Sequence, residues 1–250
     1  MEDCKEVATP IATNCLMDAD EAGNQVDSTK YRGLIGSLLY LTGSRPDIQF
    51  GVCLCATFQS NSKESNFKAA KWILKYLKGT TNVGLWYPNE SNIVLSGFSD
   101  SDYAGCKLDR KSDTCHLLGS SLISWNSKKQ ACVALFTAEV EYIVAGHACA
   151  QSIWLKHQFM DYGVKLEKVP LYCDNTSAIN LTKNPIQHSK TKHIEIRNNF
   201  IRDHIQKGDI EIMFVKTENQ LANLFTKPLA RDRFNKLRTE FGIFDMKNIC

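Results

Sequence analysis

The spacing of apolar residues changes along the chain from a helical period to a strand period, near residue 90. Before that point, apolar positions recur at helical spacing and predict three helices, over about residues 29–41, from residue 46 onward, and from residue 62 or 65 to 78. Ser28 is a suitable cap for the first helix and Gly79 is a suitable end for the third. The polar, turn-rich residues 1–28 predict an extended arm.

The second part of the chain predicts strands first and then alternating helices and strands. Alternating apolar residues predict an antiparallel meander with strands at 93–99, 103–107, 115–118 and 122–125, and a weaker candidate at 132–136. A long helix follows at 138–162, then a buried strand at 169–173, a helix, another helix at 193–207, a strand at 210–215 and a helix from 217. This order predicts an α/β fold with a mixed sheet that has helices on both faces.

A chain of 250 residues that is 43% hydrophobic is long enough for two small domains. We expect the sheet to form one domain and the first helices another. The predicted division is an extended arm (1–28), a helical segment (29–86), a linker (87–92), the mixed-sheet domain (93–229) and a C-terminal helix and tail (230–250).

The third predicted helix has a basic stripe beside its apolar one. Lys68, Lys71, Lys75 and Lys78 follow helical spacing, and the apolar stripe consists of Phe67, Ala70, Leu74 and Leu77. Four lysines along one helix could follow a phosphate backbone, but a solvated helix face gives the same pattern. The net charge of +3 does not by itself indicate a polyanionic partner.

The cysteines and the apolar runs indicate an intracellular protein. The ten cysteines are scattered through apolar segments, without the spacing of a zinc site, and Met1-Glu2-Asp3 does not begin a secretory signal. We therefore expect reduced thiols. The longest apolar run, residues 35–41, is too short to span a bilayer, so we expect no membrane partner.

Three acidic residues far apart in the chain are predicted to meet at one edge of the sheet. Asp100 ends the first strand, Glu141 lies in the first turns of the long helix, and Asp174 follows the buried strand. Ligands of such sheets gather beyond the strand ends. Converging carboxylates repel one another and require a cation, and hard oxygen ligands favour Mg²⁺.

Six motifs, in order, resemble the ribonuclease H domain of copia-type retrotransposon Pol polyproteins. Residues 31–48 also resemble the segment that follows the reverse transcriptase palm of these polyproteins, so the resemblance spans nearly the whole chain. The motifs are Gly97 to Gly105, Ile123-Ser124-Trp125 with Ser127 to Gln130, Thr137 to Tyr142, Leu171 to Ile179, Thr191 to Ile194, and Leu224 to Leu229.

The resemblance implies a ribonuclease H-like fold with a five-stranded mixed sheet flanked by helices. It also implies hydrolysis of the RNA strand of an RNA–DNA hybrid with two Mg²⁺ ions, for which Mn²⁺ could substitute. One ion would activate the attacking water and the other would stabilise the leaving oxygen. Asp100 would bridge both ions, and Glu141 and Asp174 would complete the two coordination shells. Glu141 matches the family's helix better than Glu139, and the two point about 200° apart on a helix.

The chain departs from the family at two places. The family's fourth carboxylate falls on Asn223, which we include among the catalytic positions although an amide lacks the charge that would help to hold the second ion. The hairpin around residues 111–115 is about two residues shorter than usual, which predicts strain or a changed register. These departures favour an alternative, a catalytically impaired transposon remnant that binds nucleic acid without cutting it.

The resemblance also places a basic segment where the family binds the hybrid. Its residues are Lys190, Lys192, His193 and Arg197. For His193, a structural role at the start of a helix is an equal alternative. The expected partners are nucleic acid and the rest of a Pol polyprotein (reverse transcriptase and integrase), in the cytoplasm, within a virus-like particle, or in the nucleus. A third hypothesis, a helical interaction module in residues 1–86, depends on the lysine stripe alone.

Overall fold

The structure is a computed structural model that describes residues 4–13, 17, 20–89, 93–102, 111–129, 137–183 and 200–248. Contacts group the chain into two compact units. The sheet unit contains the described residues of 88–103 and 111–223, and the helical unit contains those of 1–87 and 224–250. The predicted strands at 103–107 and 132–136 both lie outside the described residues.

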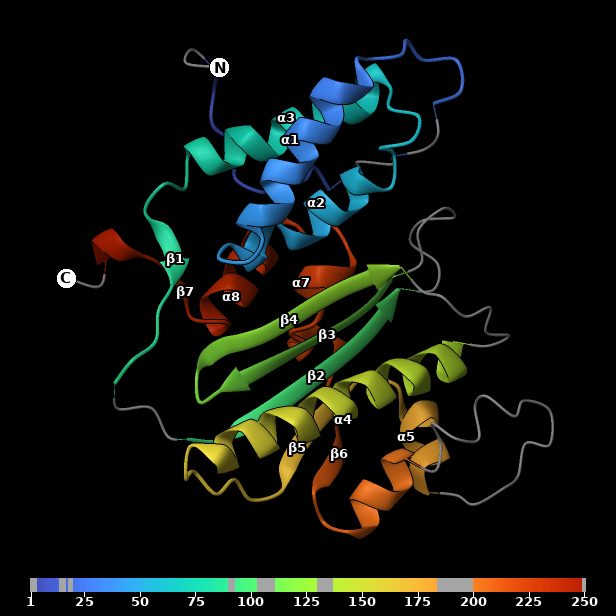
Figure 1. Cartoon of the computed structure of the whole chain (residues 1–250), viewed down its shortest axis with the longest axis vertical. Helices are drawn as coiled ribbons and strands as arrows, with labels where there is room; N and C mark the ends of the chain where they lie inside the picture. The colour runs from blue at the N-terminus through green and yellow to red at the C-terminus, as the bar shows by residue number, and fades with distance from the viewer. Residues whose placement is uncertain are drawn as a thin grey trace. The chain divides into compact units, whose positions relative to one another are not determined.

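The sheet unit is built on a five-stranded mixed sheet (Figure 1). The strand order is β4-β3-β2-β5-β6, with β2 and β4 antiparallel to β3, β5 parallel to β2, and β6 parallel to β5. This confirms the predicted five-stranded mixed sheet. The strands are β2 (Leu95–Asp102), β3 (Lys111–Leu118), β4 (Ser121–Lys129), β5 (Val169–Cys173) and β6 (Ile210–Phe214).

Helix α4 (Thr137–Asp161) packs along the sheet and supplies much of its core. Ala145, Ala148 and Cys149 are buried against strands β2 and β5 and against α5 (Thr176–Lys183). The helix ends before Gly163, whose φ of 77° is strained for residues with a side chain. A further helix, over the described residues 200–206, ends in the same way before Gly208.

The pairing of β2 with β3 is regular despite the shortened hairpin. Its register runs without interruption from Leu95 opposite Leu118 to Asp102 opposite Lys111. The one irregularity recorded for these described strands lies between His116 and Leu117, where β3 pairs with β4. The expected misregister of β2 and β3 is therefore wrong for the described residues, and β3 begins at residue 111 rather than at 115.

The helical unit combines the N-terminal helices with the end of the chain. Strands β1 and β7 pair antiparallel, and the ring of Tyr76 packs edge-on against that of Phe234. The C-terminal segment therefore belongs to the core of this unit. The elements are α1 (Ser28–Leu41), η1 (Pro46–Ile48), α2 (Gln49–Ala56), α3 (Glu64–Lys78), β1 (Val83–Leu85), α8 (Arg231–Glu240), β7 (Ile243–Asp245) and η3 (Met246–Asn248).

Two details of the N-terminal helices differ from the sequence prediction. Asp27 rather than Ser28 caps α1, because its side chain accepts hydrogen bonds from the backbone N–H groups of Thr29 and Lys30. The buried face of α3 consists of Asn66, Ala70, Ile73 and Tyr76, so of the predicted apolar stripe only Ala70 is fully buried. A polar network explains this shift, because the Tyr76 hydroxyl donates to Asp47, which also pairs with Arg45 at 2.7 Å.

Candidate metal centre

The topology of the sheet brings the predicted acidic residues to one edge. Because β2 and β5 are parallel, their carboxyl ends lie on the same side of the sheet, and Asp100 and Asp174 are at those ends. Glu141 approaches from the second turn of α4. Asp100 and Glu141 are buried, with exposed fractions of 4% and 5%, and Asp174 is half-buried. Glu139, two residues earlier on α4, is less buried than Glu141.

Interatomic distances and electrostatic coupling show that these groups form one cluster. One carboxylate oxygen each from Glu141 and Asp174 and the Sγ of Cys173 lie within 4.8 Å of one another. The charge of Asp100 acts on both Glu141 and Cys173. Asp100, Glu141 and Asp174 therefore lie at the same edge of the sheet, and Cys173, which sequence reasoning missed, lies beside Glu141 and Asp174.

Burial and mutual repulsion disfavour the charged forms of the described groups in this cluster. Burial, and then the charge of Asp100, raise the pKa of Glu141 to about 8, although two hydrogen bonds from Ser101 oppose this shift. Burial, and then Glu141, raise the pKa of Cys173 to about 12. A divalent cation would relieve this repulsion, and carboxylate oxygens are the ligands that Mg²⁺ prefers. The donor set thus fits the cation that the fold family implies.

Short hydrogen bonds hold the acidic side chains in place. Ser101 donates to Glu141 Oε1 through its backbone N–H at 3.1 Å and through Oγ at 2.8 Å. Thr217 Oγ1 donates to Asp174 Oδ2 at 2.8 Å. The only sequence signal for Ser101 was its position between two aspartates, and Thr217 could be recognised only as the start of a helical turn.

Asn223 stabilises the turn that carries Thr217. Its Nδ2 donates to the carbonyl oxygen of Thr217 at 2.8 Å, and its side chain is buried. Gln220 Nε2 donates to the carbonyl oxygen of Ser99 at 2.9 Å, which ties the same turn to β2. This turn is the short helix η2 (Thr217–Asn219), followed by α7 (Asn223–Thr226), rather than the continuous helix predicted from residue 217.

A further acidic residue lies beside Asp100 within the sheet. Asp113 of β3 is directly opposite Asp100 and is completely buried. Directly opposed residues of an antiparallel pair share a face of the sheet. Both aspartates contribute to the raised pKa of the Cys115 thiol, after its burial. Asp113 therefore adds a further carboxyl group near the metal centre.

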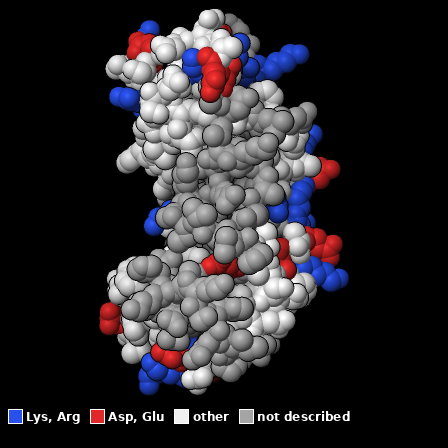
Figure 2. Space-filling model, turned by 90° about the vertical axis from the view of Figure 1, so that its right-hand side faces the viewer, with Lys and Arg blue, Asp and Glu red and all other residues white. Residues whose placement is uncertain are grey.

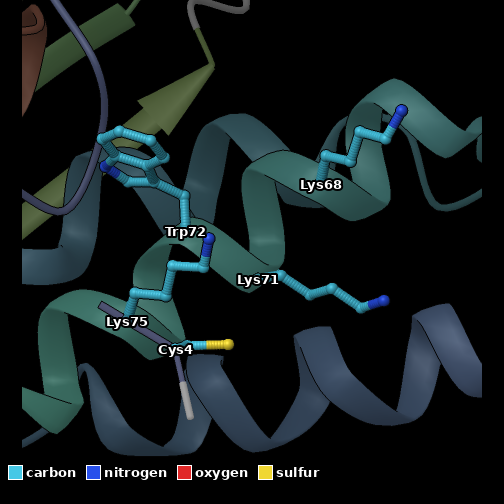
Figure 3. A pocket seen from close by; sticks show the side chains of 5 residues that line it. All are labelled: Cys4, Lys68, Lys71, Trp72 and Lys75. Carbon is cyan, nitrogen blue, oxygen red and sulfur yellow. The ribbon is translucent and has the colours of Figure 1, made fainter. Parts of the chain in front are cut away.

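The predicted lysine stripe lies on α3. Three of its members, Lys68, Lys71 and Lys75, line a hollow of about 550 Å³ together with Trp72 and Cys4 (Figure 3). Lys68 forms an exposed ion pair with Glu64, and Lys71 Nζ lies 4.2 Å from the centroid of the Phe67 ring. Trp72 Nε1 donates to the carbonyl oxygen of Thr9, which fixes the indole. Lys78 Nζ donates to the carbonyl oxygen of Cys4.

The other predicted nucleic-acid-binding residues cannot be placed. Lys190, Lys192, His193 and Arg197 lie outside the described residues. On the face shown in Figure 2, described basic and acidic side chains lie interspersed rather than in one continuous patch of either sign. No described helix is both long and apolar enough to cross a membrane.

Comparison with known proteins gives matches over nearly the whole chain. The chain is 37% identical over 242 residues to the retrovirus-related Pol polyprotein from transposon RE1 of Arabidopsis thaliana, which covers 96% of this chain and 16% of that protein. It is 36% identical over 253 residues to the corresponding polyprotein from transposon TNT 1-94 of Nicotiana tabacum, covering 97% of this chain and 19% of that protein. The chain thus spans less than a fifth of the length of these relatives.

Other comparisons add little detail. No family profile matches the chain. Among solved structures, the chain is similar to a ribonuclease H from the halophilic archaeon Halobacterium salinarum, with 11% identity and a TM-score of 0.38, covering 51% of this chain and 89% of that one. From its sequence relatives, the chain belongs to the family of copia-type retrotransposon Pol polyproteins, of which it matches one segment.

Proposed function

We propose that the sheet unit is a divalent-metal-dependent nuclease that cuts the RNA strand of RNA–DNA hybrids. The observation that carries this proposal is the meeting of Asp100, Glu141 and Asp174 at the carboxyl ends of β2 and β5. A divalent cation would replace the proton on Glu141 and relieve the charge repulsion within this cluster, and the hard oxygen donors favour Mg²⁺. The membership of the chain in a retrotransposon polyprotein family supports a nucleic acid substrate.

The residues of the chain have separate roles in this proposal. Asp100, Glu141 and Asp174 hold the cations. When bound, these cations lower the pKa of the attacking water and offset the charge on the departing oxygen. Ser101 and Thr217 are positioning residues, because each donates a hydrogen bond that orients one carboxylate toward the others.

Asn223 supports a second candidate function, binding of nucleic acid without cleavage. The resemblance places a carboxylate at this position, and here the amide donates to the Thr217 carbonyl instead. Losing one preorganised charged group costs about 10²- to 10³-fold in rate, by analogy with oxyanion sites. Weak cleavage and no cleavage are therefore the two outcomes to distinguish.

The helical unit contributes a nucleic-acid contact in this proposal. Lys75 projects beside the fixed indole of Trp72 (Figure 3), and an ammonium group next to an aromatic ring suits a single strand or a hybrid backbone. Lys71 extends away from the indole, and its ammonium lies over the ring of Phe67. Lys68 remains available, because its exposed ion pair with Glu64 is weak. Replacing Lys71 by Ala should weaken binding and reduce the slope of log affinity against log salt concentration by about 1.

A cleavage assay on a labelled RNA–DNA hybrid tests the proposal. The parent protein should cut the RNA strand slowly in Mg²⁺ or Mn²⁺, Asp100→Asn should abolish the cleavage, and Glu139→Gln should serve as the matched control with the parent rate. Asn223→Asp should raise the rate. Binding that persists without cleavage in both the parent and Asn223→Asp would overturn the nuclease proposal and support the non-cutting alternative.

A further inference from the structure

Cys173 lies beside the metal centre, and the proposed nuclease gives it no role. It ends β5, immediately before Asp174, and its side chain is buried, with an exposed fraction of 1%. We propose that Cys173 makes this centre a binding site for a thiophilic divalent cation, Zn²⁺ or Cd²⁺, together with Glu141 and Asp174. The inference rests on the proposed function, because it gives the same two carboxylates a role as ligands.

The distances are close to those that such a cation requires. Cys173 Sγ lies 4.0 Å from Glu141 Oε2, and all three ligand atoms lie within 4.8 Å of one another. With a Zn–S bond of about 2.3 Å and a Zn–O bond of about 2.1 Å, tetrahedral coordination places sulfur and oxygen about 3.6 Å apart. Small rotations of the side chains would therefore close the site around an ion.

The local backbone and the neighbouring side chains hold the ligands in this arrangement. The backbone N–H of Asn175 donates to Cys173 Sγ at 3.5 Å, so the sulfur is fixed relative to the turn after β5. Ser101 fixes Glu141, and Thr217 fixes Asp174. Among the described residues, this is the group in which three acidic, cysteine or histidine ligand atoms come so close together.

The chemistry of sulfur distinguishes this binding mode from the magnesium mode. Thiolate ligands favour zinc and cadmium, whereas magnesium requires oxygen ligands and gains nothing from sulfur. On binding, the thiol loses its proton to solvent and forms a sulfur–metal bond. Zinc would thus occupy two of the carboxylates that magnesium uses, and the two cations would compete. The centre would therefore be inhibited by zinc.

Cadmium absorption tests this inference, because a cadmium–thiolate bond gives a charge-transfer band in the ultraviolet that is independent of catalysis. In the parent protein, titration with Cd²⁺ should give a component that saturates at one equivalent. Cys173→Ser and Glu141→Gln should both lose this component, and Cys149→Ser, which removes another buried thiol of the same unit, should keep it. A component that is unchanged in Cys173→Ser would overturn the inference.

Two further measurements make the result decisive. In the parent protein alone, excess Mg²⁺ should weaken the cadmium component, and a band indifferent to Mg²⁺ would contradict a shared site whether or not the variants fold. Circular dichroism checks the fold of Cys173→Ser, with Cys173→Ala as a second variant. If the parent cuts hybrids while the cadmium band does not depend on Cys173, this inference fails and the nuclease proposal stands. If the cadmium band depends on Cys173 while the parent does not cut hybrids, the nuclease proposal fails and this inference stands.

Discussion

Glu141 is a buried acid whose pKa should make the stability of the sheet unit depend on pH. Its pKa in the folded protein is about 8, above the ordinary value of 4.5, because of burial and the charge of Asp100. Between pH 4.5 and 8, the folded state therefore keeps the proton on Glu141 whereas the unfolded state has released it. The contribution of Glu141 to the free energy of unfolding is fully present below pH 4.5 and is lost as pH rises to 8. Its size is a few kcal/mol.

The free energy of unfolding, measured by urea denaturation from pH 5 to 8 without divalent cations, checks this prediction. The parent should lose stability across the range, and Glu141→Gln should show a flatter profile because the amide does not titrate. Addition of Mg²⁺ should flatten the parent profile as well. If the free energy of unfolding changes with pH in the same way in the parent and in Glu141→Gln, ionisation of Glu141 does not destabilise the folded protein and the prediction is wrong.

At the scale of residues, the sequence predicts the acidic ligands but not their supports. Asp100, Glu141 and Asp174 could be recognised because they follow strands or begin a helix and match family motifs. The contacts of Ser101, Thr217 and Cys173 are set by the directions of their side chains at the edge of the sheet. The spacing of residues in the sequence does not predict these directions. The sequence motif locates Asn223, but the motif does not predict the hydrogen bond from Asn223 to the carbonyl oxygen of Thr217.

At the scale of elements, His116 connects β3 to α4. Its side chain is completely buried, and Nε2 lies 3.1 Å from both the Ala148 carbonyl oxygen and Ser152 Oγ. Burial lowers the pKa of His116 to about 4. The unfolded state therefore binds a proton at higher pH than the folded state, so stability is retained above pH 6.5 and is lost as pH falls toward 4.

Thermal unfolding at pH 4.5 and at pH 7 measures the effect of His116. The loss for the parent between pH 7 and pH 4.5 should be about 2 kcal/mol, because a pKa difference of about 2.5 has its full effect only below pH 4. His116→Gln keeps a hydrogen-bonding side chain without the titration, and it should lose less stability on acidification. An equal acid sensitivity of the two proteins would show that His116 is not the titrating group.

The apolar pattern predicts the bounds of helices and strands better than it predicts which of their residues are buried. Strand β5 and helix α4 match the prediction to within one residue, because a buried strand and a long helix give strong periodic signals. The buried face of α3 lies beside the predicted apolar stripe, of which only Ala70 is fully buried. The polar groups of Tyr76 and Asn66 do not suggest burial. Tyr76 can nevertheless be buried because its hydroxyl donates a hydrogen bond to Asp47.

At the scale of the whole molecule, the helical unit depends on residues from both ends of the chain. The predicted tail supplies α8, whose Phe234 packs against Tyr76 at a centroid distance of 5.8 Å, and β7, which pairs with β1. A sequence pattern does not show that the end of a chain returns to its beginning, because that contact spans more than 150 residues.

Phe234→Ala should therefore destabilise the helical unit. Removing a buried aromatic ring costs about 3 to 5 kcal/mol. Limited proteolysis should then cut faster within α1, α2 and α3, while Lys236→Ala, which alters an exposed residue of the same helix, should behave as the parent. Unchanged protection of the N-terminal helices would mean that α8 contributes little to their stability.

Binding of Mn²⁺, followed by electron paramagnetic resonance, tests most directly whether the three distant carboxylates share a cation. The parent should bind Mn²⁺, Mg²⁺ should displace it, and Asp100→Asn and Asp174→Asn should each bind much more weakly, whereas Glu139→Gln should match the parent. Equal Mn²⁺ affinity in the parent and in Asp100→Asn would contradict the metal centre and the function proposed from it.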